Sequence, residues 1–128
     1  MITKNYEIKA PVAEVWKALT DPKYINAWGG GPAKMTEEVG FKFSLWGGDI
    51  WGTNTKVVPG KKLIQDWYSG DWAKPSNACF ELRSKDDKTY LTLVHQGVPP
   101  KEKVDVDNGW DEFYLGPLRD YVEENASR

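Results

Sequence analysis

The segment from residue 105 to residue 124 carries apolar side chains at the spacing of an amphipathic helix. Its apolar stripe consists of Trp110, Phe113, Tyr114, Leu118, Tyr121 and Val122. Gly116-Pro117 interrupts this segment, and Pro117 has no N–H to donate to a carbonyl of the preceding turn. Because the stripe keeps its phase across the proline, the pattern predicts one helix that bends near residues 113–117.

The N-terminal part of the chain changes from a strand pattern to a helical one. Residues 2–10 alternate weakly and predict a first strand. Residues 12–20 place apolar side chains on one helical stripe, which predicts a helix with Pro11 in its first turn. Pro22 ends that helix, and residues 22–28 predict a second short helix.

Residues 34–96 alternate apolar and polar side chains in short runs separated by turn signals, which predicts six strands in a meander. The run at residues 41–45 places Phe43 on an apolar face. The next run is expected to place four side chains on one face, those of Trp51, Thr53, Thr55 and Val57. Short turns between consecutive strands favour an antiparallel sheet.

The last two strands can be aligned from the sequence. If Asp86 and Asp87 are the two turn residues, Lys85 faces Lys88 and the register follows along both strands. The expected apolar pairs are Leu82 with Leu91, Phe80 with Leu93, and Ala78 with His95. This register sorts the apolar side chains onto one face and places Cys79 on the other.

These elements predict an α+β fold, with a curved antiparallel sheet of six to seven strands wrapped around a long C-terminal helix and two short helices after the first strand. Residues 1–128 suit a single domain, since they contain no repeat, linker or low-complexity segment. A curved sheet that holds a helix can leave a cavity between the two. We therefore expect a binding site there.

Composition narrows the classes of partner. Seven tryptophans indicate either a tryptophan-rich core or an aromatic cavity or contact surface. The net charge is −2 and no long basic run occurs, so neither nucleic acid nor an anionic membrane is expected as a partner. The N-terminus has no signal-peptide pattern, no apolar run is long enough to span a membrane, and Cys79 is the only cysteine, so we expect a cytoplasmic protein.

Candidate chemistry centres on His95, the only histidine. It is interpreted either as an acid, base or polar anchor at a cavity wall, or as a half-buried histidine bonded to the backbone. Cys79 faces the other way in the predicted register, which argues against a Cys–His catalytic pair. No zinc set, phosphate loop or nucleophile motif is present, so no catalytic residue, metal or cofactor is expected.

Several stretches resemble a known family. "VVPGKKLIQDWYSGDW" (57–72), "TLVHQGVP" (92–99) and "GWDEFYLGPL" (109–118) resemble the domain called activator of heat-shock protein 90 ATPase homologue. Residues 11–28 resemble the first helical region of its superfamily, which is START-like (SRPBCC) and is known for the helix-grip fold of birch-pollen allergens. The resemblance covers nearly the whole chain. His95 matches a family position whose role looks structural.

The resemblance implies a cavity for an apolar ligand, such as a lipid, sterol or polyketide-like molecule. It also implies two other roles. In the eukaryotic co-chaperone this domain is the C-terminal half and helps to activate the ATPase of the chaperone. A few superfamily members are cyclases or hydrolases of apolar molecules.

Three functional hypotheses follow. The leading one is a non-enzymatic domain that binds a small apolar or aromatic ligand between sheet and helix. The expected lining residues are Phe43, Trp51, Trp67, Phe80, Leu93, His95, Trp110 and Tyr114. The second is a chaperone-associated protein-interaction module, which an exposed patch at Trp28, Trp46 or Trp72 would favour. The third is a cyclase or hydrolase, which requires His95 and an acid in one cavity.

Overall fold

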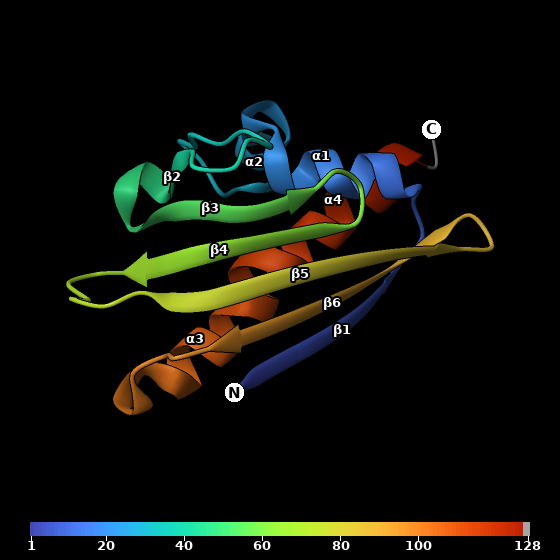
Figure 1. The fold of residues 1–128 in the computed structure, drawn as a ribbon. Coiled ribbons are helices and arrows are strands. Elements are labelled where there is room, and N and C mark those ends of the chain that lie inside the picture. Colours follow the sequence, from blue (N-terminus) through green and yellow to red (C-terminus); the bar gives the residue numbers. More distant parts are fainter. Residues whose placement is uncertain (127–128) are drawn as a thin grey trace.

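The computed structural model describes residues 1–126, and it has the predicted α+β architecture (Figure 1). The strands are β1 (Ile2–Ile8), β2 (Lys42–Leu45), β3 (Ile50–Val58), β4 (Lys62–Ser69), β5 (Ser76–Lys85) and β6 (Lys88–Gln96). The helices are α1 (Val12–Thr20), α2 (Pro22–Trp28), α3 (Lys103–Gly109) and α4 (Gly116–Ala126), together with the short turns η1 (Trp46–Gly48) and η2 (Pro100–Glu102) and the π-helical segment η3 (Trp110–Leu115).

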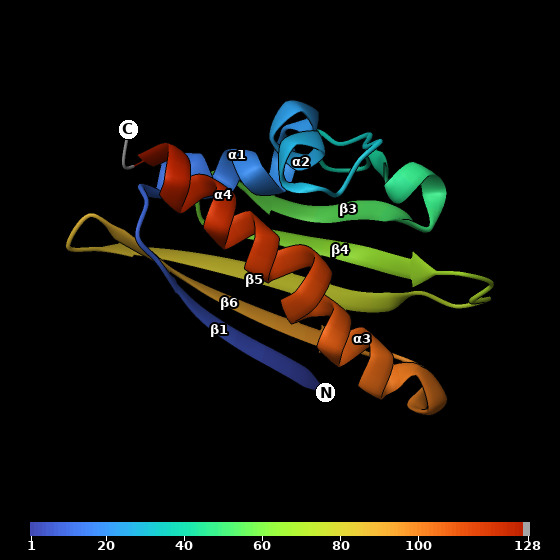
Figure 2. The ribbon, with the colours of Figure 1, turned by 180° about the vertical axis from the view of Figure 1, so that it is seen from behind.

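The strands form one curved, six-stranded antiparallel sheet in the order β1-β6-β5-β4-β3-β2. The predicted six to seven strands become six, because residues 34–39 contribute only an isolated bridge between Lys34 and Ser44. Figure 2 shows the C-terminal helical segment crossing one face of the sheet diagonally, with α1 and α2 beside its far end. The predicted two helices after the first strand and the helix-grip fold are confirmed.

The predicted register of the last hairpin is confirmed. Leu82 pairs with Leu91, and Phe80 pairs with Leu93. Its turn residues, Asp86 and Asp87, both have positive φ, at 55° and 62°. That backbone suits a two-residue turn between right-twisted strands, and aspartate tolerates it better than most residues.

The predicted face of strand β3 is wrong. Its buried side chains include Ile50 and Asn54, while the ring of Trp51 lies on the outer face and stacks on Tyr68 at 5.3 Å. A β-bulge at Thr55 then shifts the register, so the residues beyond it do not continue the alternation of those before it. The four residues predicted to share one face therefore do not.

The C-terminal segment is one continuous helical run, as predicted, and its irregularity is the π-helical segment η3. The N–H of Gly116 donates to the carbonyl of Asp111, five residues back, in place of the usual four. A Cβ at Gly116 would lie 2.2 Å from that carbonyl oxygen, so only glycine fits there. The π turn falls directly before Pro117, which has no N–H to continue an α-helical ladder.

The π turn also explains which side chains face the sheet. In a regular α-helix, three steps of four residues would rotate the side chain by about 120° in total. The wider turn removes part of that drift, and Trp110, Tyr114, Leu118 and Val122 all stay buried. Phe113, predicted to lie on the same stripe, is turned outward and is 60% exposed.

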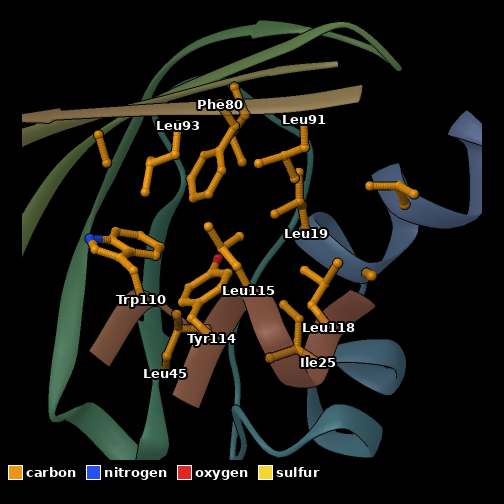
Figure 3. Packing of buried hydrophobic residues seen from close by; sticks show 14 of the residues in the cluster. Leu19, Ile25, Leu45, Phe80, Leu91, Leu93, Trp110, Tyr114, Leu115 and Leu118 are labelled. Carbon is orange, nitrogen blue, oxygen red and sulfur yellow. The ribbon is translucent and has the colours of Figure 1, made fainter. Parts of the chain in front are cut away.

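Side chains from the sheet and the helix fill the space between them (Figure 3). Phe80, Leu91 and Leu93 project from the sheet toward the helix. Trp110 and Tyr114 meet them from the other side, and the ring centroids of Phe80 and Tyr114 are 5.9 Å apart. At the centre of the domain, the helix therefore packs on the sheet as a close-packed core.

Gly116→Ala is expected to lower the free energy of unfolding by about 2–3 kcal/mol, because the new methyl group clashes with a backbone carbonyl that is fixed within the helix. The matched control is Gly109→Ala, one turn and a half earlier. A Cβ at Gly109 meets nothing closer than Phe113 Cδ2 at 3.9 Å. This control is expected to be stabilising by roughly 0.5–1 kcal/mol, the usual gain in a helix interior. Equal effects in urea unfolding would contradict the role given to the π turn.

Candidate functional site

His95 lies on the inner face of β6 and is fully buried. Its Nδ1 accepts a hydrogen bond from Trp110 Nε1 at 3.0 Å, and its Nε2 lies 2.7 Å from Ser76 Oγ. The Ser76 hydroxyl donates its one proton to the carbonyl of Trp67 at 2.7 Å. Nε2 must therefore carry the ring proton and donate to Ser76. The four groups form one hydrogen-bond chain from the helix through β6 to β5 and β4.

Burial lowers the pKa of His95 to about 4, so the ring is neutral near pH 7. A proton added at Nδ1 would face the indole N–H of Trp110, donor against donor. The chain of hydrogen bonds and the low pKa thus favour the same neutral form of the ring.

Both ring nitrogens of His95 form hydrogen bonds within the protein, which argues against its predicted roles as a polar anchor for a ligand and as a catalytic acid or base. Its hydrogen-bond partners are Ser76 and Trp110, and no carboxylate among residues 1–126 bonds to it. The ring has no free nitrogen for a ligand, and the acid that the cyclase or hydrolase hypothesis requires is missing from it. Cys79, half-buried, faces the opposite side of the sheet, as predicted.

A groove of about 430 Å³ opens where the C-terminal helical segment begins, beside the edge formed by η1, β3 and β4. The helical wall is made by Val106, Gly109, Trp110, Phe113 and Tyr114. The sheet wall is made by Trp46, Ile50 and Trp67. The exposed ring of Phe113 stands at the surface, while Trp110 and Tyr114 lie deep. The volume is within the range of sites for small organic molecules.

The rim of the groove is acidic. Asp49, at the start of β3, and Asp105, on α3, are exposed carboxylates of opposite walls, and neither has an ion-pair or hydrogen-bond partner among residues 1–126. Glu102 also lines the groove, and its carboxylate accepts a hydrogen bond from Trp72 Nε1 at 2.5 Å. The lining contains no basic residue.

Trp46, part of the sheet wall, adopts a backbone conformation that is unfavourable for a bulky residue. Its φ is 49°, in the left-handed region, which costs roughly 1–2 kcal/mol. This conformation is stabilised by a hydrogen bond of 2.8 Å from the N–H of Trp46 to the carbonyl of Gly30. The indole packs edge-on against Tyr114, with ring centroids 6.0 Å apart. Strain of this kind concentrates at functional sites.

Two groove residues carry a buried donor without a partner. Trp67 Nε1 and the hydroxyl of Tyr114 have no hydrogen-bond partner among the described residues. Burial raises the pKa of the Tyr114 hydroxyl, which therefore remains a donor. An unpaired buried donor typically costs 1–3 kcal/mol, so such groups are uncommon in a core that serves packing alone.

Residues 9–123 match the family described as Activator of Hsp90 ATPase homolog 1-like protein. The chain belongs to this family. The match confirms the resemblance drawn from the sequence.

Known members of the family and related structures cover most of the chain. The human activator of 90 kDa heat shock protein ATPase homolog 1 is 26% identical over 83% of the chain and 32% of the human protein. The chain thus spans about a third of the length of the curated relatives that it matches. The crystal structure of PFC0360w, an HSP90 activator from Plasmodium falciparum, gives a TM-score of 0.84 at 26% identity and covers 95% of this chain and 96% of that one.

A second solved structure comes from a different context. DynU16, a protein in the dynemicin biosynthetic locus, gives a TM-score of 0.82 at 26% identity. The match covers 99% of this chain and 49% of that one. The same fold thus occurs both in an HSP90 activator and in a protein from a biosynthetic locus.

The structure brings three of the eight predicted site residues into the groove of this family domain: Trp67, Trp110 and Tyr114. The other predicted residues on inner faces are packed in the core away from it, namely Phe43, Phe80, Leu93 and His95. Trp51 is on the outer face of the sheet, so its predicted place in the cavity is wrong. The candidate site therefore lies at the end of the helix instead of its centre.

The acidic rim and the places of Trp46 and Gly109 in the groove wall were not predicted from the sequence. A signal for Trp46 was present, since it directly precedes the turn glycines Gly47 and Gly48. No comparable signal marks Asp49 or Asp105, which line one groove only because two distant segments pack together.

Neither a cluster of metal-ligating side chains nor a membrane-spanning helix occurs within residues 1–126. No group of three or more histidine, cysteine, aspartate or glutamate side chains there could hold a metal ion. Over the same range, every helix is too short or too polar to cross a bilayer.

The pH dependence of stability should report the buried His95. Its folded pKa, about 4, is below the unfolded value near 6.5, so between these values the unfolded chain binds more protons. This contribution to stability is fully present above pH 6.5 and is lost as the pH falls toward 4, by about 3 kcal/mol at pH 4.

The measurement is urea unfolding at pH 7 and pH 4, with His95→Gln as the control that lacks this group. The loss of stability on acidification should be about 3 kcal/mol smaller in the variant than in the wild type. Should the variant fail to fold, NMR titration of the wild-type imidazole replaces it. A folded-state pKa near 6 would contradict the prediction.

Proposed function

We propose that this domain is a non-enzymatic binding module that takes a small apolar or aromatic ligand in the groove at the start of its C-terminal helix. The observation that carries the proposal is the groove itself, which is about 430 Å³ in volume and has five aromatic side chains in its walls. Flat rings supply a large contact area at little cost in side-chain entropy, which suits the capture of an apolar molecule.

The groove is supported from behind by fixed side chains, which favours binding over simple packing. Trp110 stacks on Trp67 with ring centroids 5.2 Å apart, and its N–H is bound to His95. Trp28 supports Tyr114 from another side, with ring centroids 4.9 Å apart. Walls held in this way need little reordering when a ligand enters, so less binding free energy is lost.

Two further observations agree with a ligand at this place. The strained backbone of Trp46 is unfavourable for stability alone, yet it places an indole in the groove wall. The likeness to DynU16, a protein in a biosynthetic locus, also supports a small-molecule ligand.

A panel of small apolar and aromatic compounds tests the proposal by thermal unfolding, because a ligand that binds only the native state raises the melting temperature. Gly109→Leu is the variant of choice. A side chain at this position starts from open space in the helical wall and extends over the groove. It is expected to lower the affinity of any hit at least tenfold.

Gly109→Ala is the matched control, since it changes the same helix position but adds only one methyl group. It should keep the affinity of the wild type within about threefold and should not lower stability. The proposal fails if no compound raises the melting temperature, or if the hits bind the Gly109→Leu variant as tightly as the wild type.

A second candidate function is contact with an Hsp90 chaperone. It is favoured by the relatives named as activators of this chaperone's ATPase, and by the coverage of almost all of the Plasmodium activator by this chain. The exposed tryptophan patch that would favour it is absent from the described residues, because Trp28 and Trp72 are buried and Trp46 is partly buried. Exposed apolar side chains near the groove, Val104 and Phe113, would serve in its place.

On this second proposal, the purified domain raises the ATPase rate of purified Hsp90, and Phe113→Ser weakens the stimulation roughly fivefold because an exposed aromatic anchor is lost. Val39→Ser, an exposed apolar residue in the loop before β2, is the control and should leave the stimulation unchanged. An unstimulated ATPase, with no complex in gel filtration, would exclude direct activation by this domain.

A further inference from the structure

The charge around the groove is of one sign on both of its walls. The carboxylate of Asp49 comes from the sheet side and that of Asp105 from the helix side. Neither has a cationic partner among the described residues, whereas acids elsewhere do, such as Glu7 with Lys88. Among the described residues, both carboxylates thus lack an ion-pair partner.

Positive charges also lie near the groove, since Lys101 and Lys103 flank Glu102 in the sequence, but neither of them lines the groove. The N-terminus of α3 contributes a partial positive charge of about half a unit, which three nearby acids outweigh. One of these, Glu102, accepts a hydrogen bond from the indole N–H of Trp72, which is a neutral donor. No lysine, arginine or histidine side chain lines the groove.

The aromatic rings of the groove walls are a second feature that favours a positively charged ligand. Indole and phenol rings attract a cation over their faces, and tryptophan does so most strongly. Phe113, which is exposed, and Trp46, which is partly buried, line the same groove as the carboxylates. Aromatic faces combined with carboxylates are the usual chemistry by which proteins recognise organic ammonium groups.

We infer that the ligand of this groove is an organic cation, a protonated amine or quaternary ammonium group on a flat apolar body. The inference rests on the proposed function of the same groove and adds the charge of the ligand. The apolar body lies against Trp110 and Tyr114, and the ammonium group lies at the rim between Asp49 and Asp105. Neutral molecules of the same shape bind more weakly, and carboxylates are repelled.

Three naphthalene compounds of nearly equal shape test this: 1-naphthylmethylammonium, 1-naphthylmethanol and 1-naphthoate. Isothermal titration calorimetry at pH 7 and low salt compares them on the full chain. We expect the ammonium compound to bind at least roughly fivefold more tightly than the alcohol, and the carboxylate to bind most weakly. Added salt should reduce the difference, because the rim charges are exposed.

The double variant Asp49→Asn, Asp105→Asn removes both charges and keeps the shape of the side chains. It should reduce the preference for the ammonium compound to less than roughly twofold and leave the affinity of the alcohol unchanged. Asp86→Asn is the control, since it removes one exposed charge at the turn of the β5–β6 hairpin, at the other end of the sheet (Figure 1), where asparagine tolerates the positive φ. It should change neither affinity.

The outcomes separate the two proposals. If the alcohol binds as tightly as the ammonium compound, or if the double variant keeps the preference, the inference about charge is overturned while the binding groove stands. If none of the three compounds binds while other compounds of the panel raise the melting temperature, the inference is overturned and the binding groove stands. If no compound of either set binds, the proposed function fails and the inference fails with it. If Gly109→Leu leaves binding of the ammonium compound intact, that compound binds elsewhere and the inference is likewise overturned.

Discussion

The hydrogen bond from the indole N–H of Trp110 to Nδ1 of His95 determines how the helix lies on the sheet. Both groups are buried, so any rotation of the helix that broke the bond would leave a donor and an acceptor unpaired, at roughly 1–3 kcal/mol each. The indole is also surrounded by other rings, with the centroid of Tyr114 4.7 Å away. Its opposite side faces the groove, so one side chain fixes both the packing of the core and the wall of the site.

Features set by local alternation and turn chemistry could be predicted from the sequence. The register of the β5–β6 hairpin followed from its apolar stripe and the two aspartates, because a slip by one residue would turn Glu81 inward. The continuity of the C-terminal helix could be predicted because its stripe of apolar side chains keeps its phase across Pro117. In both cases neighbouring residues carried the information, and the outcome did not depend on distant packing.

Features set by contacts between distant segments could not be predicted in this way. The inner face of strand β3 could not be recognised from the sequence, because two of its inward-facing residues, Gly52 and Asn54, have no apolar side chain. Gly52 is required by a close approach, since a Cβ would lie 1.8 Å from the carbonyl oxygen of Asp66. Asn54 points inward to bind the carbonyls of Thr36 and Glu38. The apparent pattern therefore favoured Trp51, which faces the other way.

The π-helical segment connects α3, which lines the groove, to α4, which packs in the core. A π turn accommodates one residue more than an α turn, so loss of a single residue there would restore regular geometry and leave α3 and α4 in about the same orientation. Asp105 and Gly109 would stay at the groove, while Leu118 and Val122 would keep their places in the core. A one-residue insertion or deletion in this segment is therefore absorbed locally and changes only which of its own side chains face the sheet.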